Sequence, residues 1–236
     1  MSNLGGRVIA IAGAGGGLGP VVAARLAADD ATLALTDRDQ ERLDVIGADL
    51  DISEDRLDAR AVDLVDAEAT TAWREALVER FGKVDGLIHL VGGWKGGDAL
   101  TETPLADYEW LQDLLVRTVQ HTTRAFHDSL TAGGAGRFVL VSSAQAQSPS
   151  ASNASYAAAK AAAEAWTLAL ADSYSEHGAT ANIVVVNAIL TPQMREDNPD
   201  KPYATFTSTG DIADAIAFLC SDAAAKMNGK RLSLHP

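Results

Sequence analysis

Short apolar segments alternate with longer amphipathic stretches along the whole chain. A three- and four-residue spacing, from Ala69 through Trp73 and Leu77 to Arg80, predicts one of the helices between these segments. Thr103 and Pro104 predict the start of another helix, as N-cap and first-turn proline. Apolar and β-branched runs predict the strands Val8–Ala12, Thr32–Leu35, Ala59–Val62, Gly86–Val91, Arg137–Val141, Ile183–Val186 and Arg231–Leu234.

The predicted strands are continuous apolar runs rather than alternating ones, which is typical of a sheet covered on both faces. Each connection is long enough for a right-handed helical crossover between parallel strands. The sequence therefore predicts an α/β fold, a doubly wound and mostly parallel sheet of seven strands with helices on both faces. Because no Pro- or Ser-rich linker divides the chain, we expect residues 1–236 to form one domain. Such a sheet binds its ligand beyond the carboxyl ends of the strands.

The composition is that of a soluble protein and argues against nucleic acid as a partner. Of 236 residues, 47% are hydrophobic and 22% are charged, and the formal net charge is -13. Phosphate backbones repel such a surface, and the sequence has no basic stripe with interleaved aromatic residues. A dinucleotide is still compatible with this charge, because backbone N–H groups and a helix dipole act locally. The acidity is otherwise explained by solubility alone.

Cys220 is the only cysteine, which excludes an internal disulfide, and its apolar neighbours predict a buried structural thiol on a helix. The first residues lack the cationic and apolar segments of a signal peptide. The most apolar run, Ile183–Val186, is too short to span a bilayer. We therefore expect a cytoplasmic protein with no membrane partner.

A glycine-rich turn follows the first predicted strand and opens a helix. Glycine lets the chain turn tightly and lets the backbone approach a pyrophosphate, which the free N–H groups of the helix N-terminus then bind. The alternative is a turn that binds nothing. The residues predicted to bind a dinucleotide here are Gly13, Gly15, Gly17, Leu18 and Gly19.

Asp37 lies just beyond the second predicted strand, at about the distance from the turn expected of a ribose-binding carboxylate. A carboxylate there accepts hydrogen bonds from the adenosine 2′-hydroxyl and repels a 2′-phosphate, so we expect NAD(H) to be preferred over NADP(H). Arg38 is a complication, because a guanidinium beside this position could bind a 2′-phosphate. While Asp37 is present, we interpret Arg38 as a solvated residue or a cover over the adenine.

Tyr156 and Lys160 lie four positions apart on a predicted helix, so the phenol and the ammonium share one face. Ser143 lies just beyond the carboxyl end of the fifth predicted strand. With the glycine-rich turn, these residues resemble the short-chain dehydrogenase/reductase family, in its single-domain Rossmann-type form, over essentially the whole chain. The glycines that match the family's Gly-x-x-x-Gly-x-Gly turn are Gly13, Gly17 and Gly19.

The resemblance implies an oxidoreductase that moves hydride between NAD(H) and a small carbonyl or alcohol, with Ser143, Tyr156 and Lys160 as catalytic residues. A free tyrosine has a pKa of about 10, too high for a base near neutral pH. Lowering it by about three units takes roughly 4 kcal/mol, which a positive charge about 4 Å away supplies at an effective dielectric of about 20. Lys160 provides that charge, Ser143 would bind the substrate oxygen, and both Tyr156 and Lys160 are expected to contact the cofactor.

The resemblance also implies further cofactor contacts. Asp63, followed by Leu64, matches a turn that contacts adenine, although a helix-capping role for Asp63 stays open. Val91 ends the fourth predicted strand and Gly92 follows it, where the cofactor is expected to pass. Thr191 matches the threonine that binds the nicotinamide carboxamide, with a helix N-cap as the alternative.

The chain departs from the family pattern after the sixth predicted strand, where Val186 and Asn187 replace Pro-Gly, and at two further places. Leu115 stands where the family has a catalytic asparagine, and a leucine cannot hold the water that links Lys160 to solvent. His89 begins the stretch that replaces the family's Asn-Asn-Ala-Gly, and we interpret it as a satisfied strand-end histidine rather than an acid/base residue. A polar neighbour such as Thr118 could replace the proton relay. The alternative function is a non-catalytic NAD-binding regulatory or sensor protein.

Two segments are expected to lie near the substrate. Trp94 lies in a glycine-rich loop after the fourth strand, either as a wall of the substrate site or as a buried indole. The segment 192–206, rich in Pro, Asp and Asn, occupies the family's substrate-lid position. The alanine-rich helix around residues 157–165 predicts a homodimer or homotetramer, and packing against the chain's own sheet is the alternative.

Overall fold

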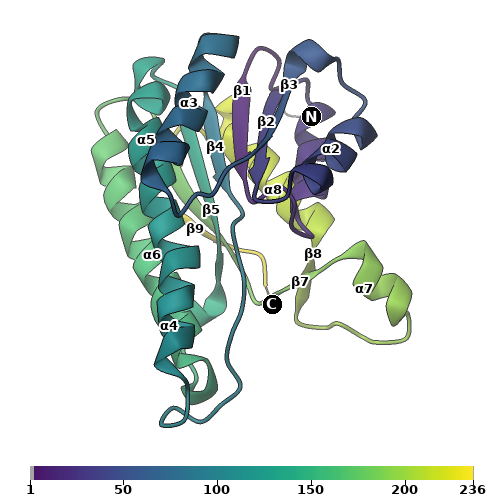
Figure 1. Cartoon of the computed structure of the whole chain (residues 1–236), viewed down its shortest axis with the longest axis vertical. Coiled ribbons are helices and arrows are strands. Elements are labelled where there is room, and N and C mark those ends of the chain that lie inside the picture. The colour runs from purple at the N-terminus through teal and green to yellow at the C-terminus, as the bar shows by residue number, and fades with distance from the viewer. Residues whose placement is uncertain (1–2, 236) are drawn as a thin grey trace.

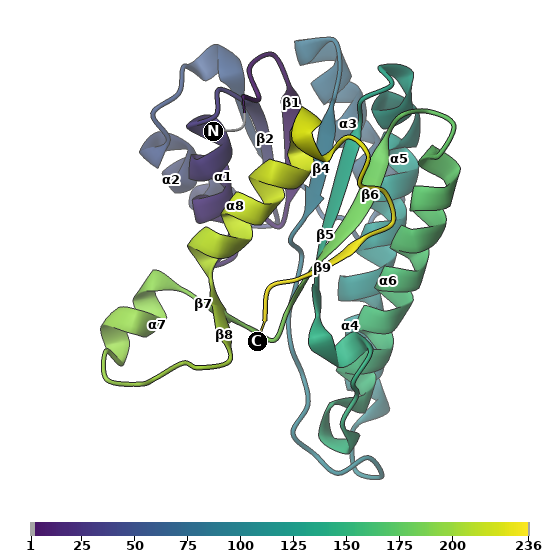
Figure 2. The ribbon, with the colours of Figure 1, turned by 180° about the vertical axis from the view of Figure 1, so that it is seen from behind.

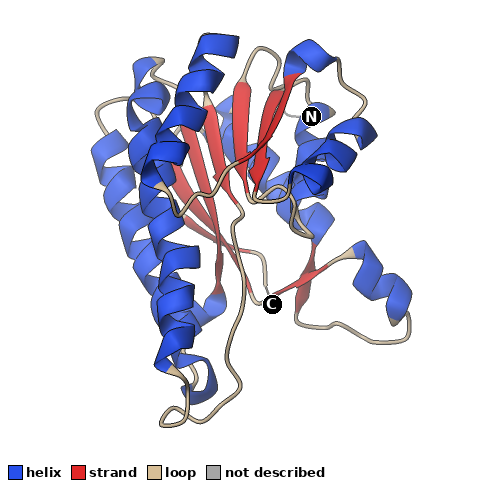
Figure 3. Cartoon of the chain, in the orientation of Figure 1, coloured by secondary structure: helices blue, strands red, loops and turns tan. Residues whose placement is uncertain are grey.

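Seven parallel strands form the central sheet of the protein (Figure 3), in a computed structural model that describes residues 3–235. The strand order is β3-β2-β1-β4-β5-β6-β9, and every neighbouring pair is parallel. Each predicted strand is present, so the predicted α/β doubly wound sheet is confirmed. The strands are β1 (Val8–Ala12), β2 (Thr32–Asp37), β3 (Leu57–Ala61), β4 (Gly86–His89), β5 (Arg137–Ser143), β6 (Thr180–Val186) and β9 (Arg231–Ser233).

Helices cover both faces of this sheet. Figures 1 and 2 show α1, α2 and α8 on one side and α3, α5 and α6 on the other, with α4 beside α6. The helices are α1 (Gly19–Ala27), α2 (Gln40–Asp49), α3 (Ala67–Phe81), α4 (Leu105–Gln112), α5 (Thr118–Ala132), α6 (Ala154–Tyr174), α7 (Pro192–Asp197) and α8 (Thr209–Cys220). None of the helices in the described part of the chain is long and apolar enough to cross a membrane.

Two apolar cores, one on each face of the sheet, explain the continuous apolar runs of the strands. Along β1, Ile9 and Ile11 belong to the core beneath α1 and α8, whereas Val8 and Ala10 belong to the core beneath α3, α5 and α6. Because successive side chains of a strand point to opposite faces, a strand buried on both sides needs apolar residues at consecutive positions.

The single cysteine and the alanine-rich helix bear on two further predictions. Cys220 ends α8 and is buried, as expected, and burial raises the pKa of its thiol to about 12. In α6, Ala163 and Ala171 pack against the sheet. This supports the alternative interpretation, in which the alanine-rich helix packs within the chain rather than against another subunit. Ala158 and Ala162 are exposed, so a homodimer or homotetramer remains a prediction.

Several element boundaries differ from the predicted ones. β3 begins at Leu57 rather than Ala59, and β4 ends at His89, which leaves Val91 in the following loop. The predicted N-cap at Thr103 is wrong: Pro104 occupies the N-cap position of α4 with extended backbone, and the Thr103 hydroxyl donates to the Ala99 carbonyl instead. A residue with ψ near 130° has not entered the helix, so the proline precedes the first turn.

A second, two-stranded parallel sheet was not predicted. It pairs β7 (Ala188–Leu190) with β8 (Phe206–Ser208) and closes the segment that carries α7. Figure 2 shows this segment extending away from the central sheet, below α8. Tyr203 anchors it, because its hydroxyl donates to the Met194 carbonyl at 2.6 Å and its ring packs edge-on against Phe206.

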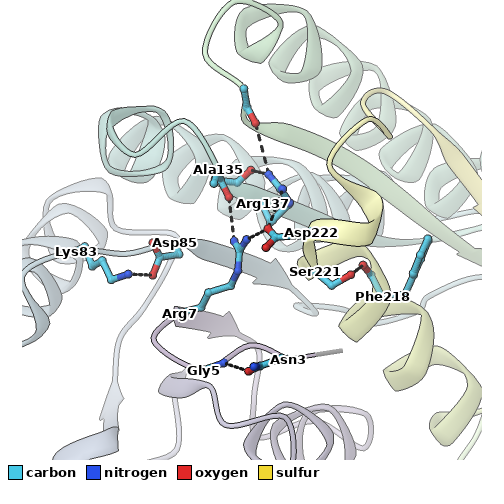
Figure 4. A network of polar contacts seen from close by, with 12 residues as sticks. Asn3, Gly5, Arg7, Lys83, Asp85, Ala135, Arg137, Phe218, Ser221 and Asp222 are labelled. Atoms are coloured by element: carbon cyan, nitrogen blue, oxygen red, sulfur yellow. Dashed lines mark hydrogen bonds and ion pairs between the residues drawn. The ribbon is translucent and has the colours of Figure 1, made fainter. Parts of the chain in front are cut away.

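The amino ends of the strands are held by an arginine network (Figure 4). Arg7, just before β1, donates to the Ala135 carbonyl at 3.0 Å and pairs with Asp222. Arg137, at the start of β5, is buried and lies 4.0 Å from the same Asp222. Three segments that are distant in sequence are therefore joined at the edge of the sheet opposite the carboxyl ends.

Candidate active site

A cavity of about 650 Å³ opens beyond the carboxyl ends of the central strands. Its walls come from the last residues of β2, β5 and β6, from the segments that follow β1, β2, β3, β4 and β6, and from the helical residues of α6 and of the stretch that leads into α5. In a parallel sheet these strand ends meet on one edge, which is the expected position for a ligand. The arrangement brings the predicted nucleotide residues and the predicted catalytic residues into one cavity.

The glycine-rich turn takes the shape that the sequence predicts for it. Gly13 has φ +85°, and a Cβ atom there would lie 2.6 Å from the Val91 backbone nitrogen. At Gly19 a Cβ atom would lie 2.0 Å from the Ala14 carbonyl oxygen, so no larger residue fits where α1 begins. Gly17 and Leu18 line the cavity together with Gly13. Two close backbone approaches thus account for glycine at both ends of the turn.

Asp37 closes this part of the cavity from the end of β2. Its Oδ2 accepts a hydrogen bond from Gly15 N at 3.0 Å, and its Oδ1 accepts one from Arg38 N at 2.7 Å. These bonds fix the carboxylate against the turn and leave lone pairs for further donors. Arg38 also lines the cavity. Gly15 therefore acts on the site through Asp37 rather than as part of the cavity wall.

Of the further predicted cofactor residues, most line the cavity and one does not. Asp63 lines it with Leu64, and its Oδ1 accepts from Val65 N at 3.0 Å. The helix-capping alternative for Asp63 is wrong, because Asp66 caps α3. The wall also includes Val91 and Gly92. Thr191 instead caps α7, with Met194 N donating to its hydroxyl at 3.2 Å, so the N-cap alternative is observed.

Ser143, Tyr156 and Lys160 meet at the inner end of the cavity. Ser143 is the last residue of β5, and the other two lie one turn apart on α6. Lys160 Nζ donates to the Val141 carbonyl at 3.1 Å and lies 6.0 Å from the centre of the Tyr156 ring. The tertiary fold thus places a hydroxyl, a phenol and an ammonium around one space.

Burial sets the protonation of these groups. Burial raises the pKa of Tyr156, and a hydrogen bond with the Ser143 side chain opposes this by lowering it. Burial also lowers the pKa of Lys160 to about 8, and the charge of Glu164 acts in the opposite direction. Without other charges, Tyr156 is therefore a neutral phenol that can donate a proton, while the ammonium of Lys160 is held close to its titration point.

Leu115 lies in an irregular stretch between α4 and α5. Residues Asp113–Arg117 form a π-helical turn, an arrangement frequent at functional sites. The Leu115 side chain is only 2% exposed and packs in an apolar cluster with Leu111 and Ala159, which also contacts Tyr156. Leu115 is therefore an apolar support for the tyrosine ring.

His89 is fully buried and hydrogen-bonded through both ring nitrogens. Its Nε2 lies 3.1 Å from the Thr118 hydroxyl, and its Nδ1 lies 3.3 Å from the Thr122 hydroxyl. The Thr118 hydroxyl donates to the Leu114 carbonyl at 2.7 Å and also lines the cavity. Burial lowers the pKa of His89 to about 3, with a smaller contribution from the charge of Lys160. His89 is thus the satisfied, neutral histidine that we expect from the sequence.

Trp94 stands at the mouth of the cavity. Its side chain lines the cavity and is 57% exposed, which contradicts the alternative of a buried indole. The neighbouring Lys95 pairs with Asp107 at 2.5 Å and lies 5.0 Å from the centre of the Trp110 ring. These contacts join the glycine-rich loop to α4, so the loop is held against the helix at this point.

Several residues that line the cavity were not predicted from the sequence. Leu114 enters the wall from the π-helical turn, and Asn187 and Ile189 enter it from the segment after β6. The sequence carries a partial signal for the second group, because residues that follow a parallel strand lie at the ligand edge of the sheet. Leu114 has no such signal. Its position depends on how α4 and α5 pack against α6.

Comparison with known proteins adds a family to this geometry. A family model described as short chain dehydrogenase matches residues 7–202. The 7alpha-hydroxysteroid dehydrogenase of Escherichia coli (strain K12) is 26% identical over 241 residues, which cover 98% of this chain and 94% of that protein. The levodione reductase of Leifsonia aquatica is 30% identical over 243 residues, covering 94% and 90%. The crystal structure of 3-ketoacyl-(acyl-carrier-protein) reductase from Brucella melitensis complexed with NADH matches with a TM-score of 0.86 at 28% identity, covering 98% of this chain and 97% of that one.

Proposed function

The chain belongs to the short-chain dehydrogenase family, and on this basis we propose that it transfers hydride between NAD(H) and a small carbonyl or alcohol, with Tyr156 as the acid/base residue. The observation that carries the proposal is the convergence of Ser143, Tyr156 and Lys160 in the cavity that also holds the glycine-rich turn. Relatives named as a hydroxysteroid dehydrogenase and a levodione reductase support an oxidoreductase. The substrate of this chain is not specified by their names.

The cavity fits a nicotinamide dinucleotide. The turn before α1 presents backbone N–H groups to a pyrophosphate, and Asp37 offers a carboxylate to a ribose hydroxyl. When bound, the nicotinamide supplies or accepts the hydride. The NADH complex of the Brucella reductase supports this class of cofactor, and the negative charge of Asp37 supports NAD(H) over NADP(H).

The residues of the chain would handle the proton and the substrate oxygen. In carbonyl reduction, Tyr156 donates its phenolic proton to the oxygen that becomes the alcohol. Lys160, as an ammonium, stabilises the phenolate left on Tyr156. Ser143 donates a hydrogen bond to the same substrate oxygen and orients it. In alcohol oxidation the same proton moves in reverse, from the substrate to the phenolate.

The test is turnover of NADH across a panel of carbonyl compounds. We expect wild-type protein to oxidise NADH with at least one carbonyl, and Tyr156→Phe to reduce turnover by about 100-fold or more, the usual contribution of general acid–base catalysis. NADH affinity should stay within a few-fold, because the ring is retained. Lys160→Met should reduce both turnover and NADH affinity. Activity retained in Tyr156→Phe would refute the proposed proton donor.

One observation favours a second candidate, a non-catalytic NAD-binding regulatory or sensor protein. Leu115, at the position where the sequence pattern leads us to expect the family's asparagine, is a buried apolar side chain. This candidate predicts tight NADH binding without turnover of any carbonyl in the panel. It also predicts a partner interaction that changes when NADH binds.

A further inference from the structure

Glu164 is a buried acid that the proposed reaction does not use. It follows Tyr156 and Lys160 on α6 at the same four-residue interval, so the three side chains lie along one face of the helix. Glu164 is only 4% exposed, and Lys160 is 6% exposed. A carboxylate is rarely buried to this extent unless it is paired, which raises the question of what this one does.

Arg231 holds the Glu164 carboxylate from β9, the edge strand of the sheet. Its Nε lies 2.8 Å from Oε2, and its Nη2 donates to Oε1 at 3.2 Å. One hydrogen bond and one close ion-pair contact thus tie the carboxylate to the guanidinium. The Arg231 side chain is 22% exposed, so its charge is partly screened by water, whereas the charge of Glu164 is not.

Lys160 has few other charges around it. Its own helix contributes Tyr156, a neutral phenol, and Glu164. β4 contributes His89, which is neutral because its pKa is about 3, and β9 contributes Arg231 beyond the Glu164 carboxylate. Within residues 3–235, Glu164 is the acid whose charge acts to keep Lys160 protonated.

We propose that Glu164, held by Arg231, is a positioning residue that keeps the Lys160 ammonium charged beside Tyr156. The proposal rests on the proposed function, in which Lys160 must carry a positive charge to stabilise the Tyr156 phenolate. Burial lowers the pKa of Lys160 and so favours loss of its proton, and a carboxylate one turn away on the same buried face opposes that loss. Arg231 ties this electrostatic support to the edge of the sheet.

A purely structural role makes a different prediction. If the ion pair only joins α6 to β9, its removal changes stability but leaves the titration of Lys160 unchanged. If Glu164 acts on Lys160 by its charge, its removal lowers the pH at which Lys160 loses its proton. The two roles are therefore separated by a pH titration rather than by activity at one pH.

The experiment compares Glu164→Gln and Glu164→Asp in the full chain, with Asp172→Asn as the matched control. Asp172 is an exposed acid on the same helix. The side-chain signal of Lys160, assigned by its loss in Lys160→Met, is titrated by NMR in protein labelled at lysine. We expect a midpoint near 8 in wild type and in Asp172→Asn, and a midpoint lower by about one pH unit in Glu164→Gln. Glu164→Asp keeps the charge and should lie closer to wild type.

The same shift should appear in the pH profile of carbonyl reduction. With a midpoint lower by about one unit, Glu164→Gln should lose about threefold in kcat/KM at pH 7.5 relative to wild type and little at pH 6. A folded Glu164→Gln protein whose Lys160 titrates with wild type would overturn the proposal. If this variant does not fold, the double variant Glu164→Leu with Arg231→Met replaces the ion pair by apolar side chains, and its midpoint must lie below that of Arg231→Met alone.

The two readouts also separate this inference from the proposed function. The NMR titration needs neither substrate nor turnover, so it decides the role of Glu164 even if no carbonyl is reduced. If wild type shows no turnover but the Lys160 midpoint is lowered in Glu164→Gln, only the proposed function is contradicted. If wild type shows turnover but the Lys160 midpoint is unchanged in Glu164→Gln, only the inference about Glu164 is contradicted.

Discussion

At the scale of single residues, the site depends on polar groups whose surroundings fix their charge. Asp37 keeps its carboxylate in place with two backbone N–H bonds, from Gly15 and Arg38. Lys160 donates to a main-chain carbonyl, and Glu164 opposes the loss of its proton. Each of these groups acts through a second residue that orients it or sets its charge, so substitutions at the supporting positions should also alter function.

The charge of Asp37 leads to a prediction about cofactor choice. We expect NAD(H) to bind at least about tenfold more tightly than NADP(H), about 1.4 kcal/mol, because the carboxylate opposes a 2′-phosphate. Asp37→Ala should narrow this difference, and Asp44→Asn, which removes a carboxylate from α2, should leave it unchanged. Fluorescence titration with NADH and NADPH measures both affinities. Equal or reversed affinities in wild type would contradict the predicted preference for NAD(H).

At the scale of elements, the distinctive feature is the π-helical turn that joins α4 to α5. It places Leu115 in an apolar cluster against Tyr156, while Thr118, one turn later, carries the polar contact with His89. Thr118 is therefore the polar group of this segment that reaches the cavity. Any proton relay that this chain uses has to be compatible with an apolar residue at position 115.

This apolar packing determines how an asparagine at position 115 would affect stability and turnover. We expect Leu115→Asn to lower the free energy of unfolding by about 1–3 kcal/mol, because the buried amide finds no partner in the apolar cluster. Turnover should not rise. Leu115→Met, which conserves volume, should cost less than about 1.5 kcal/mol. Urea denaturation and NADH turnover measure the two effects, and a faster Leu115→Asn enzyme would show that the wild-type relay is merely impaired.

At the scale of the whole molecule, the two ends of the parallel strands carry different features. The cavity lies at their carboxyl ends, and Arg7, Arg137 and Asp222 join segments at their amino ends (Figure 4). Asp222 lies between two guanidinium groups, and one of them, Arg137, is buried. Its carboxylate therefore offsets a repulsion that would otherwise act between the first strand and the fifth.

The amino edge can be tested without touching the site. We expect Asp222→Asn to lower the free energy of unfolding by about 1 kcal/mol, at the upper end for an exposed ion pair, because two arginines share this carboxylate. Glu75→Gln, which breaks an exposed pair with Arg74, should have almost no effect. Urea denaturation measures both, and NADH affinity should be unchanged in each. Equal stability of the two variants would show that the network contributes nothing.

The sequence by itself determined the features that depend on local pattern. Consecutive apolar positions predicted strands buried on both faces, and the glycines of the first turn predicted a backbone that no side chain can enter. The position of Asp37 at the end of β2 and of Ser143 at the end of β5 followed from the same pattern, because residues that end parallel strands meet at one edge. The four-residue spacing of Tyr156 and Lys160 placed both on one face of α6.

Only the tertiary structure decided what depends on packing between distant segments. Leu115 supports the Tyr156 ring because α4, α5 and α6 pack together around it. Thr191 is recognised as the cap of α7 only in the folded chain, and its contact with the cofactor stays a prediction. Glu164 is an ordinary helical acid in the sequence, and its burial beside Lys160 arises because β9, near the end of the chain, brings Arg231 to it. Local spacing fixes which face a side chain occupies, but burial, partners and charge state are set by whatever the rest of the chain places against that face.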